Sequence, residues 1–122
     1  MAQRGFHVIS FKYAFTGIMS ALKEEPNLKF HLLAGLVVII ISFLLKISKI
    51  DWIIIILLIG FVMAVELTNT AIEAVVDGFT QANHPGAKLA KDISAGAVLV
   101  VAITSSVIGA LIFLPYIFQW II

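Results

Sequence analysis

The sequence predicts an all-α integral membrane protein, with three transmembrane helices preceded by an amphipathic helix at the membrane surface. Of its 122 residues, 61% are hydrophobic and only 12% are charged, whereas a soluble domain is about half apolar and about a quarter charged. The chain also contains three apolar runs of about the length that a membrane span requires, roughly 20 residues. We expect a single domain over residues 1–122, with the surface helix at about 6–24 and the transmembrane helices at about 28–46, 52–78 and 89–115.

The N-terminal segment HVISFKYAFTGIMSALKEE is too polar to cross a membrane. Its apolar residues Phe11, Phe15, Ile18 and Leu22 recur at steps of three and four, which places them on one helix face. Such a helix suits the inner membrane interface, with the apolar stripe in the acyl region. Packing of this helix on the protein's own bundle explains the pattern equally well. Pro26 is expected to end the helix, because a proline disfavours helical backbone in the residue before it.

The three apolar runs differ in how clearly they end. The first extends from Leu28 to Leu45, and the third runs from Ile93 to the C-terminus without a charged residue. The second starts at Trp52 and reaches the length of a span only if the helix continues through the polar stretch that begins at Glu66. Pro115 is expected to kink or end the regular part of the third helix.

Aromatic and small residues of the spans have structural interpretations. Trp52, Tyr116 and Trp120 are expected to be aromatic anchors at the outer membrane surface. The SAGA run at 94–97 supplies small residues that allow close contact between helices, which is a packing role.

The distribution of Lys and Arg predicts the orientation, because the side that is richer in these residues normally stays cytoplasmic. The cations before the first span and after the second are Arg4, Lys12, Lys23, Lys29, Lys88 and Lys91, and those of the loop between the first two spans are Lys46 and Lys49. This asymmetry places the N-terminus and the loop at 78–88 in the cytoplasm. We expect a multi-pass protein of the cytoplasmic (inner) membrane.

Composition argues against several partners and sites. The net charge of +1 indicates no nucleic-acid partner, and the absence of cysteine excludes disulfides and thiolate metal sites. His31 and His84 each lack a second ligand three or four residues away, which argues against zinc. We expect His31 to be a polar group that is satisfied at the interface, and His84 to be a loop residue.

The stretch VELTNTAIEAVVDGF places four polar residues on one face of the second transmembrane helix. Glu66, Asn69, Glu73 and Asp77 are separated by three, four and four residues, so they share an arc of about 80°. A carboxylate in hydrocarbon costs on the order of several kcal/mol unless it is paired, hydrated or bound to a metal. The alignment therefore predicts an inward-facing site near the cytoplasmic leaflet. The alternative is that these residues only hold helices together by hydrogen bonds, as a single Asn such as Asn69 often does.

Other charged residues are expected at the same depth. Glu25 precedes the first span, and Lys91 and Asp92 stand at the start of the third. Carboxylate oxygens, together with water and phosphate oxygens, suit a hard cation such as Mg²⁺. With a lysine nearby and a carboxylate left over as a base, these groups are those that phosphoryl transfer requires. The sequence contains no GxxxxGK[ST] motif, so a nucleotide would be held without a P-loop.

Four segments resemble the prokaryotic diacylglycerol kinase family, the small integral membrane lipid kinases. They are FKYAFTGI, EPNLKFH (Glu25 to His31), ELTNTAIEAVVD (Glu66 to Asp77) and AKLAKDISAGAVLV (Ala87 to Val100). The resemblance implies a homotrimeric bundle in which each subunit has three transmembrane helices and a surface helix, with active sites between subunits. It also implies transfer of the γ-phosphate of ATP to the primary hydroxyl of a membrane lipid, with Mg²⁺ as cofactor.

The resemblance also implies roles for individual residues. Glu66 would be the general base that accepts the proton of the lipid hydroxyl, and Asn69 would help to position the reacting groups. Glu25 and Glu73 would hold the Mg²⁺ that bridges the ATP phosphates. The ATP-binding residues would be Tyr13, Glu25, Glu73, Asp77, Lys91 and Asp92.

The acceptor lipid is either undecaprenol, which would give undecaprenyl phosphate, or diacylglycerol, which would give phosphatidic acid. The EPNLKFH stretch and the His-Pro before AKD resemble the undecaprenol kinase branch more closely, and we therefore favour undecaprenol. The sequence departs from the usual family pattern at Gly78 and at Ala82-Asn83. These departures concern the geometry of the loop.

Two other functions compete with a kinase. A buried glutamate in a short oligomeric membrane protein can serve as a proton relay in a proton-coupled transporter. The acids crowd toward one side of the membrane, however, and a transporter needs a polar route through both halves. A purely structural membrane subunit would explain the helices but not the aligned acids.

Overall fold

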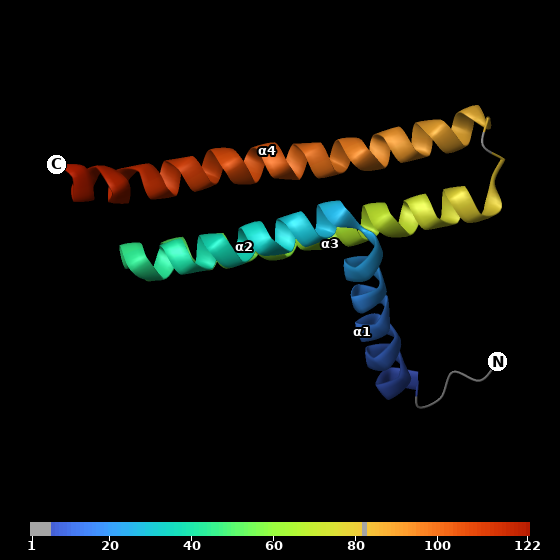
Figure 1. The fold of residues 1–122 in the computed structure, drawn as a ribbon, viewed down its shortest axis with the longest axis horizontal. Helices are drawn as coiled ribbons and strands as arrows, with labels where there is room; N and C mark the ends of the chain where they lie inside the picture. The colour runs from blue at the N-terminus through green and yellow to red at the C-terminus, as the bar shows by residue number, and fades with distance from the viewer. Residues whose placement is uncertain (1–5, 82) are drawn as a thin grey trace.

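The computed structural model describes residues 6–81 and 83–122 and confirms the all-α fold class. These residues form four helices, α1 (Phe6–Glu24), α2 (Pro26–Leu45), α3 (Lys49–Phe79) and α4 (Pro85–Ile121) (Figure 1). The last three helices are long and apolar enough to cross a membrane. Arg4, one of the predicted inner cations, and Ala82, one of the departures from the family pattern, lie outside the described residues.

The boundaries of α2 follow from local backbone chemistry. Glu25 has an extended backbone with φ −108° and ψ 107°, and Pro26 occupies the first helical position, where a missing N–H leaves no hydrogen bond unmade. The helix ends at Lys46, which has a left-handed conformation with φ 54°. The Lys46 N–H donates to the carbonyl of Phe43 at 3.2 Å, which satisfies one of the last carbonyls of the helix.

The next two helices begin at side-chain caps. The Ser48 hydroxyl accepts a hydrogen bond from the Asp51 N–H at 3.2 Å, so α3 begins at Lys49 and not near 52. The Nδ1 atom of His84 accepts a hydrogen bond from the Gly86 N–H at 3.0 Å, so α4 begins before the expected position 89. His84 is therefore a capping residue and not only a loop residue.

Pro115 lies inside α4, which continues to Ile121. Of the two alternatives expected for Pro115, the end of the regular helix is therefore wrong, and a kink stays a prediction. Proline removes one N–H donor, but in an apolar environment the following residues satisfy their own backbone groups only by remaining helical. A proline within a membrane helix is tolerated for this reason.

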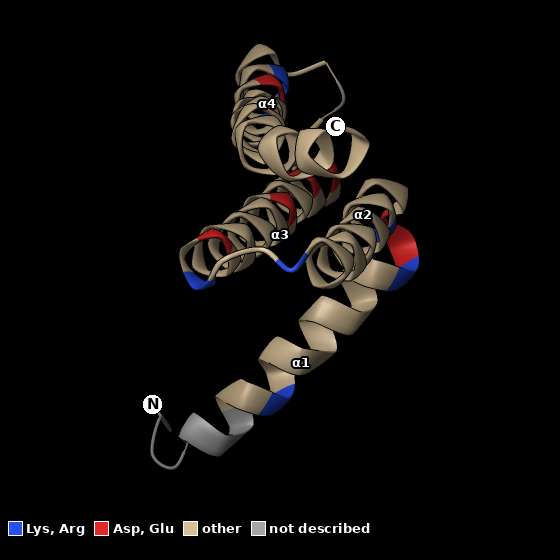
Figure 2. Cartoon of the chain, turned by 90° about the vertical axis from the view of Figure 1, so that its left-hand side faces the viewer, with Lys and Arg blue, Asp and Glu red and all other residues tan. Residues whose placement is uncertain are grey.

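The three long helices lie side by side, and α1 projects away from them at a steep angle from the start of α2 (Figure 1). Viewed along the bundle, α3 lies between α2 and α4, and it forms the most extensive contacts with both (Figure 2). α2 has 20 residues and α3 has 31, so they are about 30 Å and about 46 Å long. The last turns of α3 and the first turns of α4 therefore extend beyond the α1–α2 junction.

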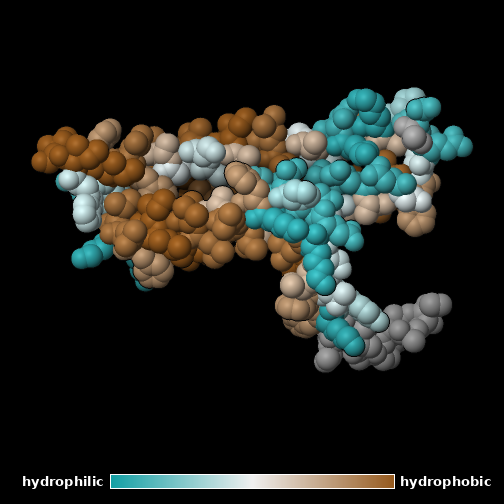
Figure 3. Space-filling view, viewed as in Figure 1, coloured by the Kyte–Doolittle hydropathy of each residue, from teal (hydrophilic) through white to brown (hydrophobic). Residues whose placement is uncertain are grey.

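Hydrophilic residues gather at this extended end and at the α1–α2 junction, and the rest of the visible face of the bundle is largely apolar (Figure 3). Large apolar side chains of the long helices are exposed, among them Phe43 (69% exposed) and Leu111 (69%). Soluble monomers rarely expose continuous apolar surfaces of this kind. The surface is that of a protein surrounded by lipid or by other subunits.

The apolar stripe of α1 is only partly packed against the rest of the chain. Phe11 (79% exposed) and Phe15 (66%) contact little of their own chain, whereas Leu22, the last residue of the stripe, is half-buried. Packing on the protein's own bundle therefore accounts only for the end of the stripe. The exposed phenylalanines remain available to a membrane interface or to another subunit.

Candidate active site

Glu66 is the most deeply buried acid among the described residues, with 3% of its side chain exposed. It lies in α3, and its Oε1 atom is 2.7 Å from Nδ1 of His31 in α2. The two atoms are close but not aligned as a good hydrogen bond, and neither has another partner in the described part of the chain. The expected inward orientation of Glu66 is thus present within a single subunit.

Asn69 connects Glu73 to α4. Its Nδ2 atom donates to Oε1 of Glu73 at 2.6 Å, and its Oδ1 atom accepts from the hydroxyl of Ser94 at 2.6 Å. The side chain of Asn69 is partly buried, and Ser94 is buried with 7% exposed. Asn69 therefore fixes the position of one oxygen of Glu73 and connects α3 to α4, as expected for an interhelical hydrogen bond, while its role in positioning the reacting groups stays a prediction.

Two ion pairs lie at the extended end of α3 and α4. Lys91 Nζ donates to Oδ1 of Asp77 at 2.9 Å, and Lys88 Nζ donates to Oδ2 of Asp92 at 2.6 Å. These four residues line a cleft of about 310 Å³. The carboxylates of Asp77 and Asp92 are more than half exposed, so this cleft is accessible to water and to a polar ligand.

The register of α2 and α3 places Glu25 near Glu73 in depth. The two helices are antiparallel, and the contact between His31 and Glu66 defines how they are aligned (Figure 1). Six residues back along α2 from His31 is Glu25, and seven residues onward along α3 from Glu66 is Glu73. At the common helical rise, these two steps reach about the same level.

A pair of carboxylates at one level, with water and phosphate oxygens, fits the coordination that Mg²⁺ prefers. Within the described residues, no group of three or more His, Asp or Glu side chains is placed to hold a metal ion. The assignment of Glu25 and Glu73 as magnesium ligands therefore stays a prediction.

Tyr13 lies apart from the other predicted site residues within one chain. It lies in α1, 67% exposed and about three helical turns from Glu25. The resemblance implies active sites between subunits, and such a site is where Tyr13 would reach a nucleotide.

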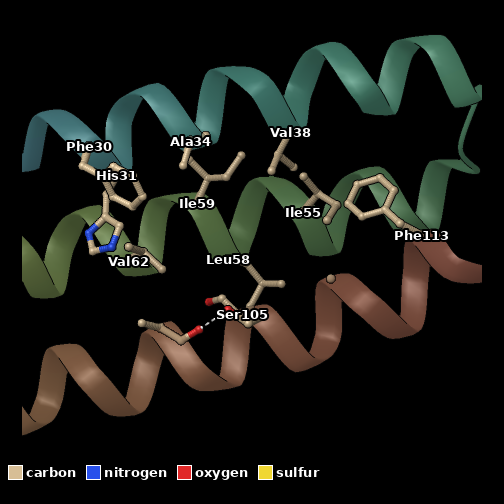
Figure 4. A pocket seen from close by; sticks show the side chains of 14 residues that line it. Phe30, His31, Ala34, Val38, Ile55, Leu58, Ile59, Val62, Ser105 and Phe113 are labelled. Carbon is tan, nitrogen blue, oxygen red and sulfur yellow. Dashed lines mark hydrogen bonds between the residues drawn. The ribbon is translucent and has the colours of Figure 1, made fainter.

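An apolar groove of about 340 Å³ extends from His31 along the three long helices (Figure 4). It is lined by all three long helices, including Val38 of α2, Leu58 of α3 and Phe113 of α4. His31 lies at one end of the groove and Phe113 at the other (Figure 4). His31, which contacts the buried Glu66, thus borders a hydrocarbon-lined groove, while Asp77, farther along α3, borders the polar cleft.

Two residues of the site were not anticipated in these roles from the sequence. His31 was expected to be a satisfied interfacial residue, and the structure places it against Glu66. Ser94 was assigned to packing within the SAGA run, and its hydroxyl binds Asn69. A usable signal was present for His31, because an ionisable residue within an apolar run needs a partner at the same depth.

Comparison with known proteins identifies the family of this chain. The family model of the prokaryotic diacylglycerol kinases matches residues 12–113. The undecaprenol kinase of Bacillus subtilis is 51% identical over 106 residues, which cover 87% of this chain and 86% of that protein.

More distant relatives are also kinases of this family. The diacylglycerol kinase of Synechocystis is 39% identical over 109 residues, 88% of this chain and 62% of that protein. The diacylglycerol kinase of Haemophilus influenzae is 34% identical over 109 residues, 88% of this chain and 92% of that protein. The chain belongs to the prokaryotic diacylglycerol kinase family.

Proposed function

We propose that this protein is a membrane lipid kinase that transfers the γ-phosphate of ATP to the hydroxyl of undecaprenol, giving undecaprenyl phosphate. The observation that carries the proposal is the buried carboxylate of Glu66, which stands between an apolar groove and a polar, lysine-containing cleft. A lipid alcohol and a nucleotide need such different surroundings at one reaction centre. Identity of 51% to an undecaprenol kinase supports the choice of acceptor.

In the proposed reaction, Glu66 is the general base. Its carboxylate accepts the proton of the lipid hydroxyl, and the hydroxyl oxygen forms a bond to the γ-phosphorus of ATP. The bond between that phosphorus and the oxygen bridging to the β-phosphate breaks, and ADP leaves. Asn69 holds Glu73 at 2.6 Å, and in this way Asn69 keeps the phosphate-binding groups in register with the base.

The nucleotide is proposed to lie at the extended end of α3 and α4. Lys91 would approach the phosphates, and Asp77 and Asp92 would complete the nucleotide region around the cleft. Glu25 and Glu73 are the residues that would hold Mg²⁺, which would bridge the phosphates and neutralise the charge developing on them. Tyr13 would contact the nucleotide from the surface helix.

The apolar groove is proposed to take the part of the acceptor lipid next to its hydroxyl. It begins at His31, which contacts Glu66, so a chain lying in it would bring its hydroxyl close to the His31–Glu66 pair. At about 340 Å³ the groove accommodates only the first part of a long isoprenoid, and the remainder would extend along the exposed apolar surface of the helices.

The proposed assembly is a homotrimer in the cytoplasmic membrane, with the N-terminus and the α3–α4 loop in the cytoplasm. A single chain leaves its apolar helices and the polar cleft open, and this supports an oligomer. The number of subunits and the placement of sites between them come from the family.

Parallel phosphorylation assays test the proposal. Purified protein in detergent with Mg-ATP would be given undecaprenol or diacylglycerol, with radiolabelled γ-phosphate as the readout. We expect undecaprenol to be the better acceptor by kcat/KM. Better use of diacylglycerol would correct the acceptor while leaving the kinase assignment intact. If neither lipid acquires phosphate and Glu66→Gln behaves like the wild type, the kinase proposal is wrong.

A further inference from the structure

We propose that His31 is a positioning residue that orients the Glu66 carboxylate, an inference that rests on the proposed kinase function. The two residues come from different helices, and Nδ1 of His31 lies 2.7 Å from Oε1 of Glu66. Each of these two atoms is buried and has no other partner among the described residues. The pair is thus the one polar connection that the structure offers to either atom in the described part of the chain.

Burial explains why Glu66 needs such a partner. With 3% of its side chain exposed, the carboxylate has lost nearly all of its hydration. An unpaired buried carboxylate is strongly unfavourable, and a neighbouring N–H donor is the least costly compensation. The His31 side chain retains 22% exposure, so the imidazole lies between the buried acid and the lumen of the groove.

The contact also determines what the second carboxylate oxygen can do. If the Nδ1–H of His31 donates to Oε1, rotation of the carboxylate is restricted and Oε2 is left to accept the proton of the lipid hydroxyl. The histidine does not take up that proton in this arrangement. It holds the base in a productive orientation, as a hydrogen-bonded partner holds a catalytic histidine in hydrolases.

The position of His31 within the groove supports this role over a purely structural one. His31 is part of the groove wall nearest Glu66, where the acceptor hydroxyl would enter (Figure 4). Other contacts already hold α2 against α3, including the close approach of Gly35 to Ile59, where a Cβ would lie 3.3 Å from the isoleucine side chain. The pair is therefore not the sole connection between these helices.

Two substitutions of His31 distinguish the effect of losing its N–H donor from the effect of changing the size of the side chain. His31→Asn places an amide nitrogen near the present Nδ1 position, whereas His31→Leu keeps the bulk and removes the donor. We expect kcat for lipid phosphorylation to fall about 100-fold in His31→Leu, the effect of a displaced catalytic group, with KM for Mg-ATP unchanged. His31→Asn is expected to recover most of this loss.

A double-mutant cycle shows whether His31 acts through Glu66. Glu66→Asp shortens the side chain and withdraws the carboxylate from His31 while retaining a base. We expect His31→Leu to cost much less in the Glu66→Asp background than in the wild type. Equal losses in both backgrounds, or equal activities of His31→Asn and His31→Leu, would overturn the proposal.

A spectroscopic readout tests the contact independently of activity. In protein labelled with ¹⁵N-histidine, the resonances of His31 are identified by their loss in His31→Asn. We expect the wild-type Nδ1 to carry a proton, and its ¹⁵N shift to change in Glu66→Gln. An unprotonated Nδ1 in the wild type, or a shift that does not respond to Glu66→Gln, would refute the inference even where the wild-type kinase is active. A protein that phosphorylates neither lipid, yet shows the expected shifts, would contradict the proposed function alone.

Discussion

Two polar clusters interrupt the apolar helices, one near the α2–α3 turn and the other toward the α3–α4 loop. At the α2–α3 turn, the hydroxyl of Tyr116 donates to Oδ2 of Asp51 at 2.6 Å and accepts from the N–H of Ser48 at 2.9 Å. The Ser48 hydroxyl in turn accepts from the N–H of Asp51. This cluster is a closed ring of hydrogen bonds that ties the turn to α4.

The second cluster is organised differently. The deeply buried Glu66 is close to a single side chain, His31, and the acids farther along α3 are increasingly exposed to water. Asp77 pairs with Lys91 but remains 63% exposed. The comparison teaches that an acid in an apolar protein has a structural role where its neighbours hold it in a ring of hydrogen bonds. It is a candidate reactive group where its surroundings leave one side open.

The largest expected difference between the clusters is in the chemical step. Glu66→Gln removes the proposed base, and we expect kcat for lipid phosphorylation to fall about 1,000-fold, within the range of general-base catalysis. Asp51→Asn is the matched control, because it makes the same neutralisation of a polar-cluster acid at the far end of α3. Its activity should equal that of the wild type in the same radiolabel assay. A similar loss in both variants would remove the distinction between the clusters.

A smaller effect is expected on the requirement for magnesium. Glu25→Gln removes one of the two proposed carboxylate ligands, so the Mg²⁺ concentration for half-maximal activity should rise about tenfold or more. The neighbouring exposed residue Glu24 provides the control, and Glu24→Gln should leave the titration curve in place. Coincident curves for the two variants would show that Glu25 is not a ligand.

The third prediction compares the two lysines of the polar cleft, Lys91 and Lys88, in their effect on KM for Mg-ATP. Lys91→Met should raise KM for Mg-ATP about tenfold, the effect of losing one charge-assisted hydrogen bond to a phosphate. Lys88, whose side chain is 78% exposed, pairs with Asp92, and Lys88→Met should raise this KM far less. Initial rates over a range of ATP concentrations decide between them, and a reversed order would move the nucleotide to the other side of the cleft.

The smallest effect is expected at the closed cluster and concerns stability alone. Tyr116→Phe removes the hydroxyl that joins Asp51 to Ser48, and we expect the free energy of unfolding to fall by about 1–2 kcal/mol. Unfolding in a denaturing detergent measures this loss, and activity per folded protein should not change. A loss of activity in the folded variant would mean that the two clusters are coupled through the length of α3.

The sequence was sufficient to predict the architecture because its signals are long and strongly apolar. Three hydrophobic runs and one amphipathic segment account for all four helices of the described chain. The ends of helices were less predictable, because caps such as Ser48 and His84 act through single side chains. The prediction that Pro115 ends the helix was wrong because proline ends helices in water but is accommodated within a hydrocarbon environment.

For the candidate site, the spacing of the polar residues in α3 indicates which of them share a helix face. It does not indicate which residues of other helices they contact. The spacing of Glu66, Asn69 and Glu73 predicted their common face. The partners His31 and Ser94 depend on the register between helices, which no local pattern encodes. The contact of Tyr116 is a further example, because the prediction of an aromatic anchor at the outer surface gives no sign that its hydroxyl binds Asp51 across the bundle.

The unequal lengths of α2 and α3 have a consequence for how this protein depends on its surroundings. α3 is 11 residues longer than α2, and the excess carries Asp77 beyond the plane in which α1 lies. A bilayer thicker than the native one would draw this charged end toward the acyl chains, and a thinner one would expose the top of the apolar groove to water. Turnover in vesicles should therefore reach its maximum at one acyl chain length.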